Sequence, residues 1–279
     1  MASRRKAFRA AALVLGISLF SPAWTARAGH PLGTEDAETR GTGNVEVEFN
    51  YERSHDREGS RLTSLGNIYT LGLLPKVDLA LSFAYLFDKP DASTPADRGF
   101  GDTQAALKTS FHDGKGWMPT LGIKAGVLLP TGDEAKGLGD GRTKGLLTLI
   151  ADWEIENLKI HANMGNEWTL QSTAGRARDT KAKASLAAEW EPKESWVLVI
   201  ETSWEKDSGS DKHGFDFLVG GKKELVKNLT LDVGIRWGLS TASPTSTYLA
   251  GLTLAFQGER PSGKNPIKDP EGQSPSESK

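Results

Sequence analysis

The chain has no cysteine among its 279 residues, so disulfides and thiolate metal sites are excluded. It also lacks an apolar run of the roughly 20 residues that a membrane-spanning helix needs, and its mean hydropathy is −0.41. No motif for a cofactor is present either, and we expect none to bind. The fold must therefore be stabilised without cross-links, and any membrane insertion must occur without helices.

The first 28 residues have the pattern of a signal peptide. Four basic residues lie within the first nine positions, an apolar stretch covers residues 10–20, and Ala26-Arg27-Ala28 forms a small-x-small cleavage site. We expect export and cleavage after Ala28. An uncleaved anchor is the alternative, although the apolar stretch is short for a membrane span.

Removal of residues 1–28 would make the chain acidic. It would leave 29 basic residues against 36 acidic ones, a net charge of about −7. A nucleic-acid-binding protein carries the opposite excess, gathered in a basic patch. We therefore expect no nucleic-acid partner.

What the sequence does contain is alternation. In "SWVLVIETSWEKDSG", Trp196, Leu198, Ile200, Thr202 and Trp204 occupy every second position, and Glu201 and Glu205 lie on the other face. Such a period of two is typical of a strand. About twelve runs of this kind fill residues 43–257, and the connections between them are alternately tight and long. The weakest run is "SLGNIYTLGLL", which puts an asparagine on the apolar face.

The aromatic residues decide between a soluble sandwich and a membrane barrel. They cluster at the two ends of the alternating runs and bound an aliphatic band. Trp196 and Trp204 are eight residues apart, which corresponds to about 21 Å along the membrane normal for a tilted strand. Because a backbone in lipid must satisfy its own hydrogen bonds, the sheet has to close. We predict an all-β fold, a closed antiparallel transmembrane β-barrel of about 12 strands.

The remaining segments flank the barrel. Residues 29–42 are polar and lack periodicity, and we predict that they form a periplasmic or luminal segment. Residues 258–279 are rich in Pro, Ser and Gly, which is typical of a disordered periplasmic tail. An even number of strands places both ends of the barrel in the periplasm. The longer connections, "DKPDASTPADRGFG" and "PTGDEAKGLGDGR", then face outward.

Two stretches carry a family resemblance. "HPLGTEDAETRGTGNVEVEFNYE" and "LPTGDEAKGLGDGRTKG" resemble the outer-membrane proteins grouped under the meta-pathway of phenol degradation, transporter-like barrels of Gram-negative bacteria. The resemblance implies an outer-membrane barrel proposed to pass small, often aromatic or apolar, compounds. It implies no catalytic residue.

The polar face of the predicted strands carries both signs of charge. Its members are candidates to line the lumen and to select solutes electrostatically: Lys108, Lys124, Lys144, Asp152, Lys159, His161, Glu201, Asp232 and Arg236. Opposite charges could equally pair across strands and fill the interior. Eight-stranded barrels are filled and barrels of sixteen or more strands hold a channel, so twelve strands leave both outcomes open.

The segment before the first strand is a candidate plug. Fourteen extended residues reach at most about 50 Å, which exceeds the membrane band, so residues 29–42 could fold back into the barrel. The acidic residues Glu35 and Asp36 could then meet lysines of the inner wall, with His30 beside them. A loose periplasmic leader is the alternative. A metal site at His30, Glu35 and Asp36 would lack a rigid scaffold.

Three classes of function remain after these exclusions. We expect a channel or transporter for small compounds, aromatic or apolar ones among them, in the cell outer membrane. An outer-membrane enzyme would need serine, histidine and a carboxylate near the lipid face, but His161 lies on the luminal face and no serine motif accompanies it. We therefore predict that the protein is not an enzyme. A filled structural barrel is the third class. The expected partners are outer-membrane lipid, the barrel assembly machinery and a small-molecule solute.

Overall fold

The computed structural model describes residues 29–91, 93–170 and 179–258. The predicted signal peptide and all but the first residue of the predicted tail lie outside these ranges. Within them, no helix is long and apolar enough to cross a membrane. The helical content of the described residues is one 3-10 turn, η1 (Glu134–Lys136).

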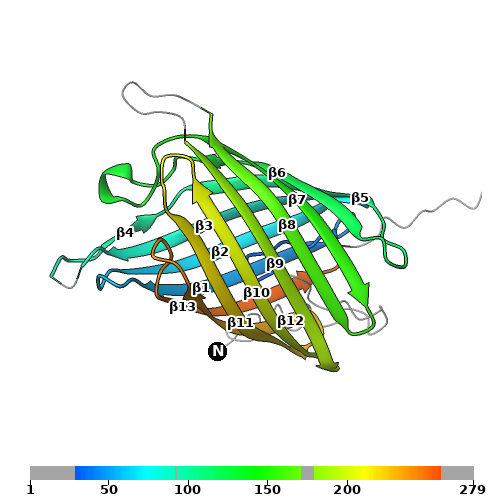
Figure 1. Ribbon diagram of the computed structural model, residues 1–279. Coiled ribbons are helices and arrows are strands. Elements are labelled where there is room, and N and C mark those ends of the chain that lie inside the picture. Colours follow the sequence, from blue (N-terminus) through cyan, green and yellow to red (C-terminus); the bar gives the residue numbers. More distant parts are fainter. Residues whose placement is uncertain (1–28, 92, 171–178, 259–279) are drawn as a thin grey trace, which may run out of the picture.

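The chain forms one antiparallel sheet that closes on itself (Figure 1). Except for β4 and β5, neighbours in sequence are neighbours in the sheet, β1 pairs with β13, and β2 pairs with both β1 and β3. The short β4 and the following β5 pair with successive parts of β3, so together they act as one wall strand. Twelve strands therefore make the wall, which confirms the predicted barrel. The elements are β1 (Val45–His55), β2 (Arg61–Leu74), β3 (Val77–Lys89), β4 (Asp97–Phe100), β5 (Thr103–His112), β6 (Thr120–Leu129), β7 (Lys144–Ile155), β8 (Leu158–Thr169), β9 (Thr180–Lys193), β10 (Trp196–Asp207), β11 (His213–Val226), β12 (Leu229–Gly238) and β13 (Ser246–Phe256).

Burial in this barrel is inverted relative to a soluble protein. The apolar side chains of the alternating runs point outward and are exposed, as Val233 (62%) and Leu186 (54%) show. The charged side chains between them point inward and are buried, with Glu201 and Asp232 each 3% exposed. An apolar outer surface around a polar interior suits a wall surrounded by lipid. The weakest predicted strand is present as β2.

The connections differ between the two ends of the barrel. At one end, β7 to β8, β9 to β10 and β11 to β12 are joined by two residues each, and Glu156, Ser195 and Asn228 adopt the positive φ that such tight turns need. The long connections lie at the other end. Short turns are periplasmic in outer-membrane barrels, which predicts an extracellular position for the long connections, and we name the two ends of the barrel accordingly. One of them is shorter than predicted, because residues 97–100 of the expected loop extend the wall as β4.

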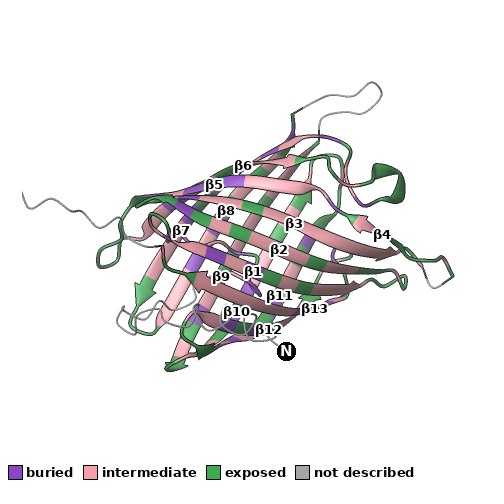
Figure 2. Cartoon of the chain, turned by 180° about the vertical axis from the view of Figure 1, so that it is seen from behind, coloured by how far each residue is buried: buried purple, intermediate pink, exposed green. Residues whose placement is uncertain are grey.

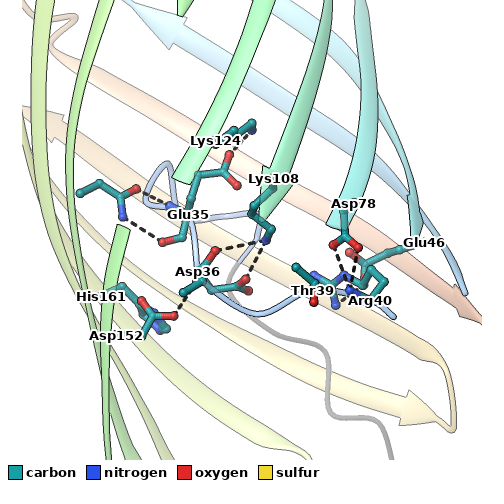
Figure 3. A network of polar contacts seen from close by, with 12 residues as sticks. Glu35, Asp36, Thr39, Arg40, Glu46, Asp78, Lys108, Lys124, Asp152 and His161 are labelled. Atoms are coloured by element: carbon teal, nitrogen blue, oxygen red, sulfur yellow. Dashed lines mark hydrogen bonds and ion pairs between the residues drawn. The ribbon is translucent and has the colours of Figure 1, made fainter. Parts of the chain in front are cut away.

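Most of residues 29–44, which we call the inner segment, lies inside the barrel rather than below it (Figure 3), whereas Thr42 and Gly43 are exposed. Ala37 is fully buried, and Thr34 and Asp36 are each 1% exposed. A small apolar cluster fixes one part of the segment, where Leu32 packs with Val199, Leu218 and other buried residues of the wall. The inner segment is therefore a packed part of the fold.

Candidate functional site: the inner segment and its cavities

A single wall carboxylate holds the first turn of the inner segment. Glu201, on β10, accepts hydrogen bonds from the backbone N–H of Gly33 (2.7 Å), the backbone N–H of Thr34 (2.8 Å) and the hydroxyl of Thr34 (2.8 Å). All three reach the same oxygen, Oε2. The other oxygen lies 3.8 Å from a guanidinium nitrogen of Arg236. Glu201 thus satisfies backbone donors that have no strand partner.

The same arrangement recurs further along the inner segment. Asn163 accepts from the backbone N–H of Glu35 (2.7 Å) and donates to its carbonyl (3.0 Å). Asp152 accepts from the N–H of Ala37 (2.6 Å). Asp78 accepts from the N–H of Arg40 through both carboxylate oxygens (3.0 and 2.9 Å). Buried backbone groups must be paired, and here the wall supplies side chains for that purpose.

Ion pairs connect the side chains of the segment to the wall (Figure 3). Asp36 pairs with Lys108 (2.8 Å), Arg40 with Glu46 (2.9 Å), and Glu35 with Lys124. Burial opposes ionisation of Asp36, but Lys108 and Arg40 outweigh it and lower its pKa to about 2. Asp36 therefore stays charged inside the barrel.

Glycines of the inner wall make room for the segment. A Cβ on Gly220 would come within 2.9 Å of the Pro31 ring, one on Gly234 within 3.0 Å of it, and one on Gly251 within 2.5 Å of the His30 ring. The three glycines lie on the adjacent strands β11, β12 and β13. His30 also contacts Asp232 on β12 through a ring nitrogen. This part of the wall is shaped to receive residues 30 and 31.

Cavities flank the inner segment on both sides. A cavity of about 450 Å³ lies toward the extracellular end, and its lining includes Glu35, Lys183 and Glu205. A second, of about 360 Å³, lies at the periplasmic end and is lined by Asp36, Lys159 and His161 among others. A third, of about 260 Å³, lies beside the segment against β1 and β3 and shares Glu35 and Lys124 with the first. The segment thus divides the lumen.

The structure places all nine predicted lining residues on the luminal side, and five of them bond directly to the inner segment. His161 is hydrogen-bonded through Nδ1 to a carboxylate oxygen of Asp152 (2.9 Å) beneath the segment, and Lys159 lines the periplasmic cavity. Lys144 lies near the outer rim, paired with Asp140 and Glu167. The five residues that bond to the segment are Lys108, Lys124, Asp152, Glu201 and Asp232.

Sequence reasoning missed other contacts of the segment. Asp78 and Asn163 were not among the candidates, although both bind its backbone. Their inward position follows from strand alternation, but the partner of an inward side chain depends on the path of the segment. Within the described part of the chain, no group of three or more histidine, aspartate or glutamate side chains is arranged to hold a metal. His30, Glu35 and Asp36 instead have separate wall partners.

Comparison with known proteins gives a family and a fold. The family described as "Putative MetA-pathway of phenol degradation" matches residues 25–256. An outer membrane channel from Pseudomonas putida F1 is 17% identical, with a TM-score of 0.61, and the match covers 81% of this chain and 100% of that one. The NanC porin is 10% identical, with a TM-score of 0.51, and the match covers 75% and 98% of the two chains. No curated protein matches significantly.

Proposed function

The chain belongs to the family of the MetA-pathway of phenol degradation, and we propose that it forms an outer-membrane channel for small compounds with the inner segment as its plug. The family description concerns an aromatic compound, which supports aromatic or apolar solutes. The fold shared with an outer membrane channel and a porin supports a path through the barrel.

The division of the lumen carries this proposal. A structural barrel would have a filled interior, whereas here cavities of about 450 and 360 Å³ lie on either side of one short segment. Residues 30–40 of the segment are held through side chains, not by strand pairing, so they can leave without opening the sheet, while Gly43 and Asn44 stay paired with Gly72 of β2. Consecutive residues, Glu35 and Asp36, line the extracellular and the periplasmic cavity respectively. Displacement of this segment would join the two cavities.

Conductance of single channels in planar bilayers tests the proposal. We compare the wild-type protein with a variant in which a Gly/Ser sequence of equal length replaces residues 30–40. The variant keeps the chain length but loses the contacts to Glu201, Asp152 and Asp78. We expect higher conductance and faster uptake of phenol into liposomes. Lys136→Gln serves as control, because it also removes the cation of an ion pair, with Asp133, but at an exposed position in η1.

The outcomes are distinct. Folding of each variant is checked by comparing its mobility in SDS gels before and after heating, because a closed barrel resists SDS until it is heated. Conductance absent from wild type and variant alike would overturn the channel proposal in favour of a filled structural barrel. Equal, measurable conductance in both would keep the channel and remove the plug.

The proposal includes a place in the cell. We infer that a cleavable signal peptide exports the chain and that the barrel assembly machinery inserts it into the outer membrane. We also propose that the protein is not an enzyme. His161, the candidate base, is 2% exposed on the luminal side of the wall, where its ring is hydrogen-bonded to Asp152. It therefore faces the lumen, away from lipid substrates.

A further inference from the structure

The outer surface of the barrel carries a group of basic side chains above the aromatic residues of β1 to β4. Along β1, the side chains of Arg53 and His55 continue the outward face that begins with Val45. The strand register pairs His55 with Arg61 of β2, and Arg61 with Lys89 of β3. We call this set, together with Arg98 of β4, the outer basic patch.

The register gives the patch two rows. The upper row is His55, Arg61 and Lys89 on three adjacent strands, and it spans about 10 Å at the usual strand spacing. In the lower row, Arg53 and Arg98 lie three strands apart, about 14 Å from each other. The rows are two residues, or about 7 Å, apart along the strands. Figure 2 shows β1 to β4 side by side on this wall.

Within the described ranges, no ion pair neutralises the patch, although Asp56 and Glu58 lie in the connection between β1 and β2 beside it. Among the described residues, the outward positions of β1 to β4 include no aspartate or glutamate, and none of the five patch residues makes an ion pair. The basic residues of the lumen behave differently, since Lys108 pairs with Asp36 and Lys183 with Glu167. The side chain of Arg53 also has a buried Nε without a hydrogen-bond partner. The patch is therefore open to an anionic ligand from outside the chain.

Aromatic side chains fix the depth of the patch in the membrane. Immediately toward the middle of the barrel lie Tyr51, Tyr85 and Phe100, with the ring centroids of Tyr85 and Phe100 5.3 Å apart. Tyr248 of β13 is the register partner of Arg53 and lies level with the lower row. The His55 ring contacts Tyr248 edge-on, with centroids 5.8 Å apart. Aromatic belts mark the boundary between hydrocarbon and headgroups. The patch, one step further out at the end with the long connections, lies among the headgroups of the outer leaflet.

We propose that the outer basic patch binds the phosphate groups of an outer-leaflet glycolipid, the lipid A part of lipopolysaccharide. Arginine presents a planar fork of donors that matches phosphate oxygens, and Arg53, Arg61 and Arg98 provide three such forks. Two rows of unpaired basic side chains, three of them arginines, suit a headgroup with more than one phosphate. The acyl chains would lie along the apolar wall below, beside Phe49 and Leu81. This inference does not depend on transport.

Lipid titration followed by native mass spectrometry tests the site. The full-length barrel is purified in a neutral detergent and titrated with diphosphoryl lipid A. The variant Arg61→Gln/Arg98→Gln removes two exposed patch residues. The control Lys206→Gln/Lys212→Gln removes two exposed basic residues at the same end, on β10 and before β11. We expect the first variant to weaken lipid A binding at least tenfold, and the control to change it less than threefold.

Two further arms identify the ligand. Monophosphoryl lipid A should bind more weakly than the diphosphoryl form to wild type, and the difference should shrink in Arg61→Gln/Arg98→Gln. Inorganic phosphate at millimolar concentration should not displace lipid A. Equal losses in both double variants, or no loss in either, would overturn the assignment, as would displacement by inorganic phosphate at lipid concentrations. Heat-dependent mobility in SDS confirms that each variant is folded.

Discussion

At the scale of residues, the interior depends on buried charges that are matched one by one. Asp36 and Lys108 are 1% and 9% exposed and have each other as partners. A buried pair gains little over apolar side chains of the same size, but removal of one member leaves an uncompensated charge. Such pairs suit a segment that must dock in one register, because a shifted register would leave several charges unpaired. The register of the inner segment is thus set by electrostatics.

The pair Asp36–Lys108 gives a prediction at this scale. Lys108→Gln should destabilise the docked inner segment by about 3–5 kcal/mol, because Asp36 then remains buried without its cation. The double variant Lys108→Gln/Asp36→Asn should recover part of this loss. The chain has no cysteine, so a single Ala37→Cys substitution reports docking through its rate of reaction with a maleimide. Ala37 is fully buried, and we expect at least tenfold faster labelling in Lys108→Gln.

Lys183→Gln is the matched control for this measurement, since its partner Glu167 lies away from the segment. Its labelling rate should equal that of the parent. Unchanged labelling in Lys108→Gln would show that the hydrogen bonds to Glu201 and Asp78 hold the segment without the ion pair.

At the scale of elements, alternation predicted the strands well. Outward and inward faces follow the pattern of the sequence even in β2, where Asn67 stands on the lipid side. The inward orientation of a residue does not, however, reveal which residue its side chain contacts. Val199 occupies a luminal position of β10, yet it is 1% exposed and packs with Leu32 of the inner segment. An apolar residue on the polar face was the available signal for this contact.

The inner segment itself was predictable only in outline. Its length and its acidic residues indicated that it could enter the lumen and meet lysines. The wall residues that bind its backbone, Glu201, Asn163 and Asp78, could not be assigned, because the pairing depends on contacts between positions more than 35 residues apart. The small inward glycines of β11, β12 and β13 acquire their meaning only once His30 and Pro31 are placed.

Arginine substitutions on the two faces of the wall test the element-scale assignment. Val233→Arg should cost about 2–4 kcal/mol of folding free energy, because Val233 is 62% exposed on the lipid face near the middle of β12. Ser203→Arg should cost clearly less, since Ser203 lines the extracellular cavity. Both values come from folding into lipid vesicles against urea. Similar costs for the two variants would mean that the inside and outside of the sheet are wrongly assigned.

At the scale of the whole molecule, charge is segregated. The outward face of β1 to β4 carries the unpaired basic side chains of the outer basic patch, whereas the luminal cavities have more acidic than basic side chains. The extracellular cavity is lined by five carboxylates and three basic residues: Glu35, Glu167, Glu201, Glu205, Asp216, Lys124, Lys183 and Arg236. The cavity beside β1 and β3 has the same excess of carboxylates. A solute entering from outside therefore meets a negative field.

This excess predicts that the channel prefers cations. In a planar bilayer with a potassium chloride gradient, the reversal potential should have the sign of a cation-selective pore. The salt concentration on the dilute side should stay near 0.1 M, because the charges of the cavity are then screened only beyond about 10 Å. Glu205→Gln/Asp216→Asn should shift the reversal potential toward zero, because both residues line the extracellular cavity. Asp56→Asn/Asp211→Asn removes the same charge from exposed positions in extracellular connections and should have little effect. An anion-selective wild type, or equal shifts in both double variants, would show that charges outside the cavity set the selectivity.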